Sequence, residues 1–168
     1  MTDQQKEFLH LCVVEQQSVK AIAETLGVPK SLLTEWYDAL KEERLKIAAV
    51  RTLWGRKKIE TPFPEFYAWY SSNERKCFYC GITEREIKEL IDGGRLATKR
   101  LATRGRKLEL DRKQADVVYS ELENIVFSCY WCNNAKTDTF TAEEFLQVGQ
   151  AFRSIWENRL NHGNRQRN

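Results

Sequence analysis

Two pairs of cysteines, each with the spacing C-x-x-C, constrain the fold of this 168-residue chain more than any other feature. The first pair is Cys77 and Cys80, and the second is Cys129 and Cys132. Four thiolates in two such turns form a closed tetrahedral zinc site, so we expect the two segments to meet around one structural Zn²⁺ ion. The alternative is that these cysteines are buried free thiols or a redox pair.

The composition is that of a globular protein in a reducing compartment. The hydrophobic fraction is 42%, and five tryptophans favour a packed core. No apolar stretch approaches the ~18 residues of a membrane span, and the polar N-terminus lacks the apolar segment of a secretory signal. We therefore expect a cytoplasmic protein, bacterial or phage-encoded, with no membrane partner and with reduced thiols. The fifth cysteine, Cys12, is predicted to be buried in a helical core.

The basic residues are unevenly distributed along the chain. The net charge of +3 is weak evidence for a nucleic-acid partner. However, residues 93–108, which we call the basic segment, contain Arg95, Lys99, Arg100, Arg104, Arg106 and Lys107 and no acid. A second basic cluster covers 56–58. Such runs are often only solvated surface, but both flank the cysteine pairs, which favours contact with phosphate, above all by Arg100, Arg104 and Arg106.

Residues 1–54 predict a helical unit. Thr2 and Gln5 form a capping box, and 19–36 read as two helices joined by a tight turn at Gly27. This pattern resembles the helix-turn-helix of repressors and transposases, which implies that Lys30, Ser31 and Thr34 of the second helix contact DNA. The alternative is a bundle that serves packing or dimerisation. The second helix is expected to continue to Trp54.

The second half of the chain predicts helices and two short strands. Thr83 and Glu86 form a capping box before a helix that ends at Gly93. Strands are expected at 108–111 and 124–128, joined by a hairpin connection at 113–123. Asn124 is expected to fix this hairpin by hydrogen bonding. A helix is expected to begin at Asn133. A last amphipathic helix, capped by Thr141, is expected to bury Phe145, Val148, Phe152, Ile155 and Trp156.

The order of motifs resembles a known family. Asp111-Arg112 on the first strand, Asn124-Ile125-Val126 on the second and Cys129-x-x-Cys132-Asn133-x-x-Lys136 after it resemble the HNH, or ββα-metal, endonuclease superfamily. The resemblance covers 63–160 and is strongest to its rare-cutting restriction endonucleases, which are homodimers that act on double-stranded DNA. It implies that Asp111 and Asn133 hold a catalytic Mg²⁺ or Mn²⁺ ion, that Arg112 binds the scissile phosphate, and that the zinc site is structural.

The expected fold class is therefore α+β and mostly helical. We expect a helix-turn-helix DNA-binding unit at 1–54, a linker at 55–62, a zinc-stapled ββα-metal nuclease domain at 63–160 and a disordered tail at 161–168.

One position departs from the superfamily. Most HNH enzymes carry a histidine general base after the aspartate, where this chain has Arg112. The two histidines, His10 and His162, lie outside the motif. The restriction branch also has Asp-Arg and uses a tyrosine, which Tyr70 matches; a phenol with a pKa of about 10 needs nearby cations for this role. Alternatives are a packed core ring for Tyr70, a turn former for Asp111 and a helix N-cap for Asn133.

Three functions remain open from the sequence. The first is a metal-dependent DNA endonuclease, sequence-specific and of restriction or homing type, acting as a homodimer on double-stranded DNA. The second is a catalytically degenerate HNH-fold zinc protein that acts as a DNA-binding or regulatory factor. The third is a protein-interaction module with a structural zinc, against which the basic segment, Asp111 and Asn133 argue.

Overall fold

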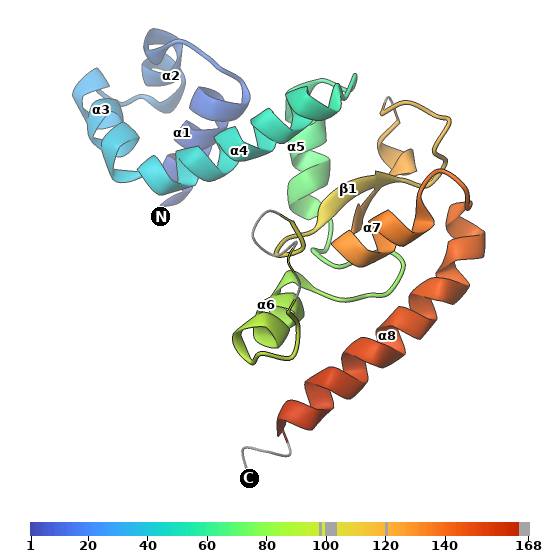
Figure 1. The fold of residues 1–168 in the computed structure, drawn as a ribbon. Coiled ribbons are helices and arrows are strands. Elements are labelled where there is room, and N and C mark those ends of the chain that lie inside the picture. Colours follow the sequence, from blue (N-terminus) through green and yellow to red (C-terminus); the bar gives the residue numbers. More distant parts are fainter. Residues whose placement is uncertain (98, 100–103, 120, 165–168) are drawn as a thin grey trace. The chain divides into compact units, whose positions relative to one another are not determined.

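A computed structural model describes residues 1–97, 99, 104–119 and 121–164. The chain forms two compact units, Met1–Ser72 and Asn73–Asn168 (Figure 1). The predicted phosphate-binding residue Arg100 and residues 165–168 of the predicted tail lie outside the described residues. Within the described part of the chain, no helix is long and apolar enough to cross a membrane.

The first unit is helical. Its elements are α1 (Asp3–Leu9), the π-helical turn η1 (His10–Val14), α2 (Val19–Leu26), α3 (Lys30–Ala39), α4 (Lys41–Lys57) and α5 (Phe63–Ser72). The predicted capping box of Thr2 and Gln5 is confirmed. Cys12 is only half-buried, so the prediction of a fully buried thiol is wrong.

Gly27 forms the turn between α2 and α3, as predicted. The hydroxyl of Ser18 caps α2, and Gly27 ends it in the left-handed region at φ 63°. Ile22, Leu33 and Trp36 are buried, and the Trp36 ring packs edge-on against Phe8 at 5.8 Å. The described helices therefore leave the opposite face of α3 to solvent, where Lys30, Ser31 and Thr34 are exposed.

The chain does not continue as one helix from Trp36 to Trp54, as the sequence predicted. Leu40 leaves the helical region (φ −98°, ψ 29°) and separates α3 from α4. The Arg44 side chain stabilises this break, because its Nε donates to the Tyr37 carbonyl at 2.8 Å and its guanidinium lies over the Tyr37 ring. The helical periodicity of apolar residues persists across the break and therefore concealed it.

The division between the units falls after Ser72, later than the expected linker. Helix α4 extends to Lys57, and the Trp54 indole donates to the Thr61 carbonyl at 2.8 Å. Phe63 at the start of α5 packs against Trp54, with ring centroids 5.7 Å apart, and lies under the Arg51 guanidinium. Helix α5 is thereby part of the first unit.

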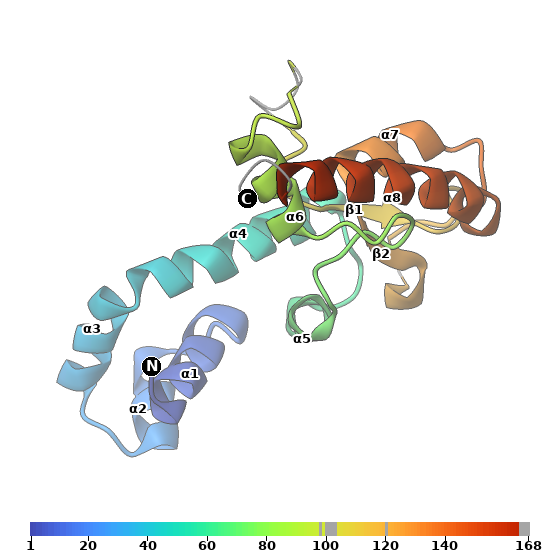
Figure 2. The same cartoon turned by 90° about the horizontal axis from the view of Figure 1, so that it is seen from below.

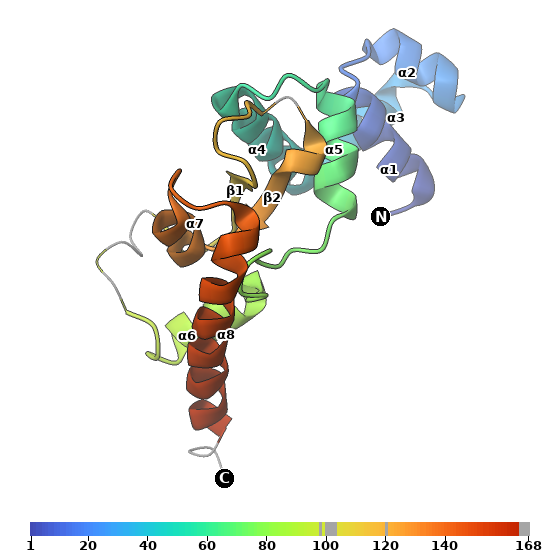
Figure 3. The same cartoon turned by 90° about the vertical axis from the view of Figure 1, so that its right-hand side faces the viewer.

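The second unit is α+β. It contains α6 (Glu84–Asp92), β1 (Glu109–Arg112), the 3₁₀ turn η3 (Leu122–Asn124), β2 (Ile125–Ser128), α7 (Tyr130–Lys136) and α8 (Ala142–Asn164). The two strands pair antiparallel, with Asp111 opposite Val126 and Arg112 opposite Ile125. Figures 2 and 3 show the hairpin with α7 beside it, which is the predicted ββα order.

Helix α8 packs along this unit through a face that differs from the predicted one. Phe145 and Trp156 are buried as expected, whereas Val148 and Ile155 are exposed, so their predicted burial is wrong. The packing face instead includes Gly149, where a Cβ atom would lie 2.4 Å from the Tyr79 carbonyl oxygen. The absence of a side chain at Gly149 lets α8 approach the first cysteine pair closely.

Helix α7 begins earlier than predicted. Its first residue is Tyr130, and the Cys129 sulfur caps it by accepting a hydrogen bond from the Cys132 N–H at 3.4 Å. Asn133 therefore lies inside the helix. The alternative role of Asn133 as a helix N-cap is wrong for this reason.

Candidate metal centre and active site

The four paired cysteines form one buried cluster. Their sulfur atoms all lie within 4.8 Å of one another, and the Cys80 and Cys129 sulfurs are 3.7 Å apart. A zinc ion with Zn–S bonds of about 2.3 Å has ligand sulfurs about 3.8 Å apart in a regular tetrahedron. All five cysteines of the chain are free thiols. The cluster could therefore hold a metal ion such as zinc.

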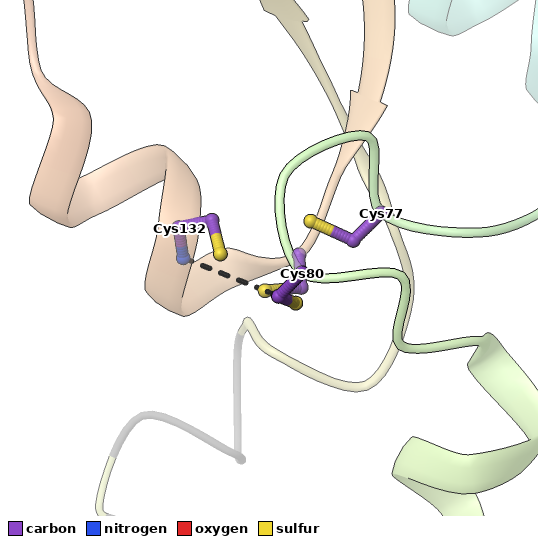
Figure 4. A group of neighbouring side chains, drawn as sticks. Cys77, Cys80 and Cys132 are labelled. Carbon is purple, nitrogen blue, oxygen red and sulfur yellow. Dashed lines mark hydrogen bonds between the residues drawn. The ribbon is translucent and has the colours of Figure 1, made fainter. Parts of the chain in front are cut away.

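Local backbone bonds build this cluster from two segments. Residues 77–80, which we call the cysteine knuckle, close into a turn when the Gly81 N–H donates to the Cys77 carbonyl at 2.8 Å. Gly81 has the positive φ of 69° that such a turn requires. The Phe78 N–H donates to the Phe127 carbonyl at 2.7 Å and ties the knuckle to β2. Cys129 is the N-cap of α7. Cys132 lies on the first turn of this helix, opposite Cys77 and Cys80 of the knuckle (Figure 4).

The electrostatics of the cluster favour a bound cation. Hydrogen bonds from the thiols of Cys129, Cys132 and Cys80 lower the pKa of Cys77. The interaction with Cys129 and with the other thiols raises the pKa of Cys132. The pKa of Cys80 is likewise lowered and that of Cys129 is raised, so the four thiols do not all ionise readily in one another's presence. Four thiolates this close together need a divalent cation to balance their charge.

Asp111 lies on β1 and is hydrogen-bonded through both carboxylate oxygens. Oδ1 accepts from the Arg112 N–H at 2.8 Å, and Oδ2 accepts from the Tyr79 hydroxyl at 2.9 Å. The Lys136 ammonium is 3.7 Å from Oδ2. The Asp111 side chain is 13% exposed, so it is not completely shielded from solvent.

Lys136 is a buried charge at the end of α7. Its side chain is 1% exposed, and its Nζ donates to the Arg112 carbonyl at 3.0 Å. A buried ammonium requires both a counter-charge and hydrogen-bond acceptors, which Asp111 and the end of β1 supply. Asp111 therefore contributes to the fold of the ββα unit and is not only a surface carboxylate.

Glu109 and Asn133 make a second contact between β1 and α7. Side chains alternate along a strand, so Glu109 and Asp111 lie on the same face of β1. The Asn133 Nδ2 donates to Glu109 Oε2 at 2.7 Å. A carboxylate only accepts hydrogen bonds, so the Asn133 amide atom that faces Glu109 must be the nitrogen Nδ2. The amide oxygen Oδ1 therefore faces away from Glu109.

Glu109 also binds the described part of the basic segment. Arg104 donates through Nε and Nη2 to its two oxygens at 2.8 and 2.5 Å. Hydrogen bonding to Glu109 raises the pKa of Arg104, whose guanidinium lies over the Tyr130 ring. Arg106 is exposed. One carboxylate thus joins a predicted phosphate-binding residue to the predicted metal ligand Asn133.

Arg112 is held by the hairpin connection. Its Nη1 donates to the Val117 carbonyl at 3.2 Å, and its guanidinium lies 5.1 Å from the Tyr119 ring centroid. Asn124 fixes the same connection through hydrogen bonds to both backbone groups of Gln114, at 2.9 and 3.2 Å. The predicted structural role of Asn124 is therefore confirmed.

The remaining predicted residues lie in the first unit. Tyr70 is half-buried in α5, and its ring is 5.8 Å from that of Phe66. Lys30, Ser31 and Thr34 are on the exposed face of α3, where the Thr34 hydroxyl donates to the Lys30 carbonyl at 3.2 Å. The second unit accordingly contains the cysteines, Asp111, Arg112 and Asn133, and the first contains Tyr70.

Asp111 offers carboxylate oxygens, the type of ligand that a hard cation prefers. Mg²⁺ commonly binds to one or two carboxylates and takes its other ligands from water and substrate phosphate. Among the described residues, only the four cysteines bring three or more His, Cys, Asp or Glu ligand atoms together. A catalytic ion at Asp111 and the Asn133 Oδ1 would therefore depend on water and phosphate for most of its shell.

Three residues of the site have roles that motif reading missed, namely Tyr79, Glu109 and Lys136. Strand alternation alone could have placed Glu109 beside Asp111. Helical spacing could have placed Lys136 one turn after Asn133 on the same face of α7. The hydrogen bond of Tyr79 to Asp111 joins distant segments, and no local pattern indicates it.

Comparison with known proteins gives one similar structure. No protein-family model and no curated protein sequence matches the chain. A solved structure of the rare-cutting HNH restriction endonuclease PacI is similar, with 31% sequence identity and a TM-score of 0.46. The match covers 56% of this chain and 63% of that endonuclease, so this chain spans less than two thirds of its length.

Proposed function

We propose that the chain is a metal-dependent DNA endonuclease that hydrolyses phosphodiester bonds in duplex DNA, sequence-specifically, in the manner of a restriction or homing enzyme. The observation that carries this proposal is the ββα unit. There, β1 and α7 contribute Asp111, Arg112 and Asn133, and a buried four-cysteine cluster lies at the start of α7. This combination suits a soft structural site beside a hard catalytic one.

Each residue has a role in this proposal. Asp111 and the Asn133 Oδ1 would hold one Mg²⁺ or Mn²⁺ ion, which when bound stabilises negative charge on the phosphate and on the leaving 3′ oxygen. Arg112 binds the scissile phosphate with a guanidinium already oriented by the Val117 carbonyl. Cys77, Cys80, Cys129 and Cys132 bind a structural Zn²⁺ that stabilises the small second unit.

The base in this proposal is Tyr70. The motif has no histidine, and the two histidines of the chain, His10 and His162, lie elsewhere. A tyrosine hydroxyl with an ordinary pKa of about 10 becomes a useful base or nucleophile only when nearby cations favour its ionised form. In this proposal, cationic charge at the DNA-bound active site would supply that stabilisation.

Duplex DNA is the proposed partner, and two surfaces would bind it. In the first unit, Lys30, Ser31 and Thr34 are exposed on α3, as a recognition helix requires. In the second, Arg104 and Arg106, together with Arg100, would contact phosphate. A homodimer would present two active sites to the two strands of a palindrome. An intracellular setting keeps the thiols reduced for zinc.

A second function is favoured by the contacts of Asp111. Both carboxylate oxygens already accept hydrogen bonds within the protein, and the buried Lys136 ammonium is 3.7 Å away. An aspartate used in this way would persist for structural reasons in a chain that had lost its nuclease activity. The alternative is therefore a catalytically degenerate zinc protein that binds DNA as a regulatory factor.

Plasmid cleavage distinguishes the two functions. Mixed-sequence plasmid is incubated with the zinc-loaded chain in Mg²⁺ or Mn²⁺ or in EDTA, and zinc content is measured after each incubation. We expect cutting by the wild type only with the divalent metal, loss of cutting in Asp111→Asn, and normal cutting in Asp116→Asn, an exposed aspartate in the hairpin connection. Tight DNA binding without cleavage of any substrate would support the regulatory factor instead.

A further inference from the structure

The side chain of Tyr79 connects the cysteine knuckle to the candidate active site. Tyr79 lies between Cys77 and Cys80 in the sequence, and its hydroxyl donates to Asp111 Oδ2 at 2.9 Å. The residue is 4% exposed, so water does not compete for this hydrogen bond. A residue of the zinc-binding turn thus contacts the proposed catalytic carboxylate directly.

The packing around Tyr79 holds its ring in one place. The ring stands edge-on to Phe78 and to Phe145, each with a centroid distance of 5.2 Å and an interplanar angle of 88°. Helix α8 packs against the Tyr79 backbone at Gly149, where no side chain would fit. The knuckle and α8 therefore restrain the Tyr79 ring, and with it the hydroxyl, through contacts other than the one with Asp111.

The hydrogen bond of Tyr79 completes the orientation of Asp111. The Arg112 N–H holds Oδ1 and the Tyr79 hydroxyl holds Oδ2, so rotation of the carboxylate about its terminal bond breaks one contact or both. Lys136 lies beside Oδ2 and supplies charge, but at 3.7 Å from that oxygen it gives little directional restraint. Each carboxylate oxygen accepts one of these two hydrogen bonds and retains a further lone pair that a metal ion could take.

We propose that Tyr79 is a positioning residue of the divalent-cation site: its buried hydroxyl holds the Asp111 carboxylate in the orientation that binds the ion. The inference rests on the proposed function, because it concerns the same carboxylate. It assigns Tyr79, one of two aromatic residues in the cysteine knuckle, a role beyond packing. Residues that orient metal ligands in this way commonly change metal affinity or activity by about 10–100-fold when they are replaced.

The variant Tyr79→Phe tests this role, because it removes the hydroxyl and keeps the ring between Phe78 and Phe145. The matched control is Tyr119→Phe in the same unit, whose hydroxyl donates to the Leu110 backbone carbonyl at 3.3 Å and whose ring remains under Arg112. Both variants lose one tyrosine hydrogen bond next to Asp111. Only the first loses a bond to the carboxylate.

The measurement is the Kd for Mn²⁺ of the full zinc-loaded chain, obtained from the electron paramagnetic resonance signal of free Mn²⁺. We expect Tyr79→Phe to raise this Kd about 10–100-fold and Tyr119→Phe to leave it unchanged, with zinc content equal in all three proteins. Equal Kd values for the wild type and Tyr79→Phe would overturn the role of Tyr79 alone. A wild type that binds no Mn²⁺ would overturn the proposed metal site and this inference with it.

A second measurement needs no substitution at Tyr79. With ¹³Cζ-labelled tyrosine in the wild type, the Tyr79 resonance should shift as Mg²⁺ is added, and the shift should saturate with the Kd of Mg²⁺ binding. A Tyr79 resonance that stays in place while Mg²⁺ binds would overturn the inference, even if Tyr79→Phe proved too unstable to study.

Discussion

Replacing Lys136 by methionine tests how strongly the ββα unit depends on its buried ion pair. Methionine fills the space of the lysine stem but has no charge and cannot donate a hydrogen bond. The variant therefore leaves the Arg112 carbonyl without the donor at 3.0 Å and Asp111 without the ammonium at 3.7 Å. The packing of the apolar part of the side chain is largely retained.

The size of the effect follows from these contacts. At 3.7 Å, an effective dielectric constant of about 20 gives an attraction of about 4–5 kcal/mol, which the cost of desolvating Lys136 partly offsets. Removal of one partner of a buried pair typically destabilises a protein by about 3–5 kcal/mol. Because the Asp111 side chain is 13% exposed and can regain some hydration, we expect about 3 kcal/mol. In a unit of this size, that lowers the Tm by about 12–24 °C.

Calorimetry and urea unfolding of the zinc-loaded chain measure this change. The control is Lys88→Met, which removes the exposed ion pair of Lys88 with Asp92 on α6 and should change stability by less than about 1 kcal/mol. A double-mutant cycle of Lys136→Met with Asp111→Asn should give a coupling energy of about 1–3 kcal/mol. If Lys136→Met were as mild as Lys88→Met, or the coupling were zero, the reasoning about the buried pair would be refuted.

Three further predictions concern the metal sites and the free thiol. Purified protein should contain about one zinc ion per chain, and Cys132→Ser should lose it and unfold the second unit by circular dichroism; a folded, metal-free protein would exclude the four-cysteine site. Glu109→Leu removes the acceptor of the Asn133 amide and should raise the Kd for Mn²⁺ about tenfold, whereas an unchanged Kd would show that Glu109 does not orient this amide. Burial raises the pKa of Cys12, although Arg44 opposes this shift, so its alkylation should require a higher pH in the folded chain than in urea. Mass spectrometry across pH 7–10 would reveal equal profiles if burial had no effect.

The parts of the fold that depend on neighbouring residues could be predicted from the sequence. The capping box of Thr83 and Glu86 begins α6, and Thr141 with Glu144 begins α8, because each pair satisfies backbone donors within one turn. Gly27 and Gly93 end helices for similarly local reasons. The two strands could also be predicted, because apolar residues alternate along the first strand and run together in the second, next to Cys129.

Features that depend on distant contacts could not be predicted. The break at Leu40 rests on Arg44 reaching back to the Tyr37 carbonyl. The exposure of Val148 follows from the direction in which α8 meets the knuckle at Gly149. A helical pattern identifies an apolar face but does not say which side of it will find a partner.

The candidate site divides in the same way. The cysteine cluster was predictable because the number and spacing of the ligands define a tetrahedral site. The contacts of Asp111 with Tyr79 and Lys136 join segments that are distant in the sequence, so motif reading identified the aspartate but not the residues that hold it. Arg104 likewise looked like a solvated surface cation in the sequence, but the structure pairs it with Glu109.

Sequencing of the DNA ends produced from a random duplex library tests the central claim, that Asp111 is the centre of metal-dependent phosphodiester cleavage. Wild-type protein with Mg²⁺ should produce new ends at one symmetric sequence, and neither EDTA nor a folded, zinc-loaded Asp111→Asn variant should produce them. Equal numbers of ends from Asp111→Asn, or no new ends from wild-type protein that binds the library, would contradict it.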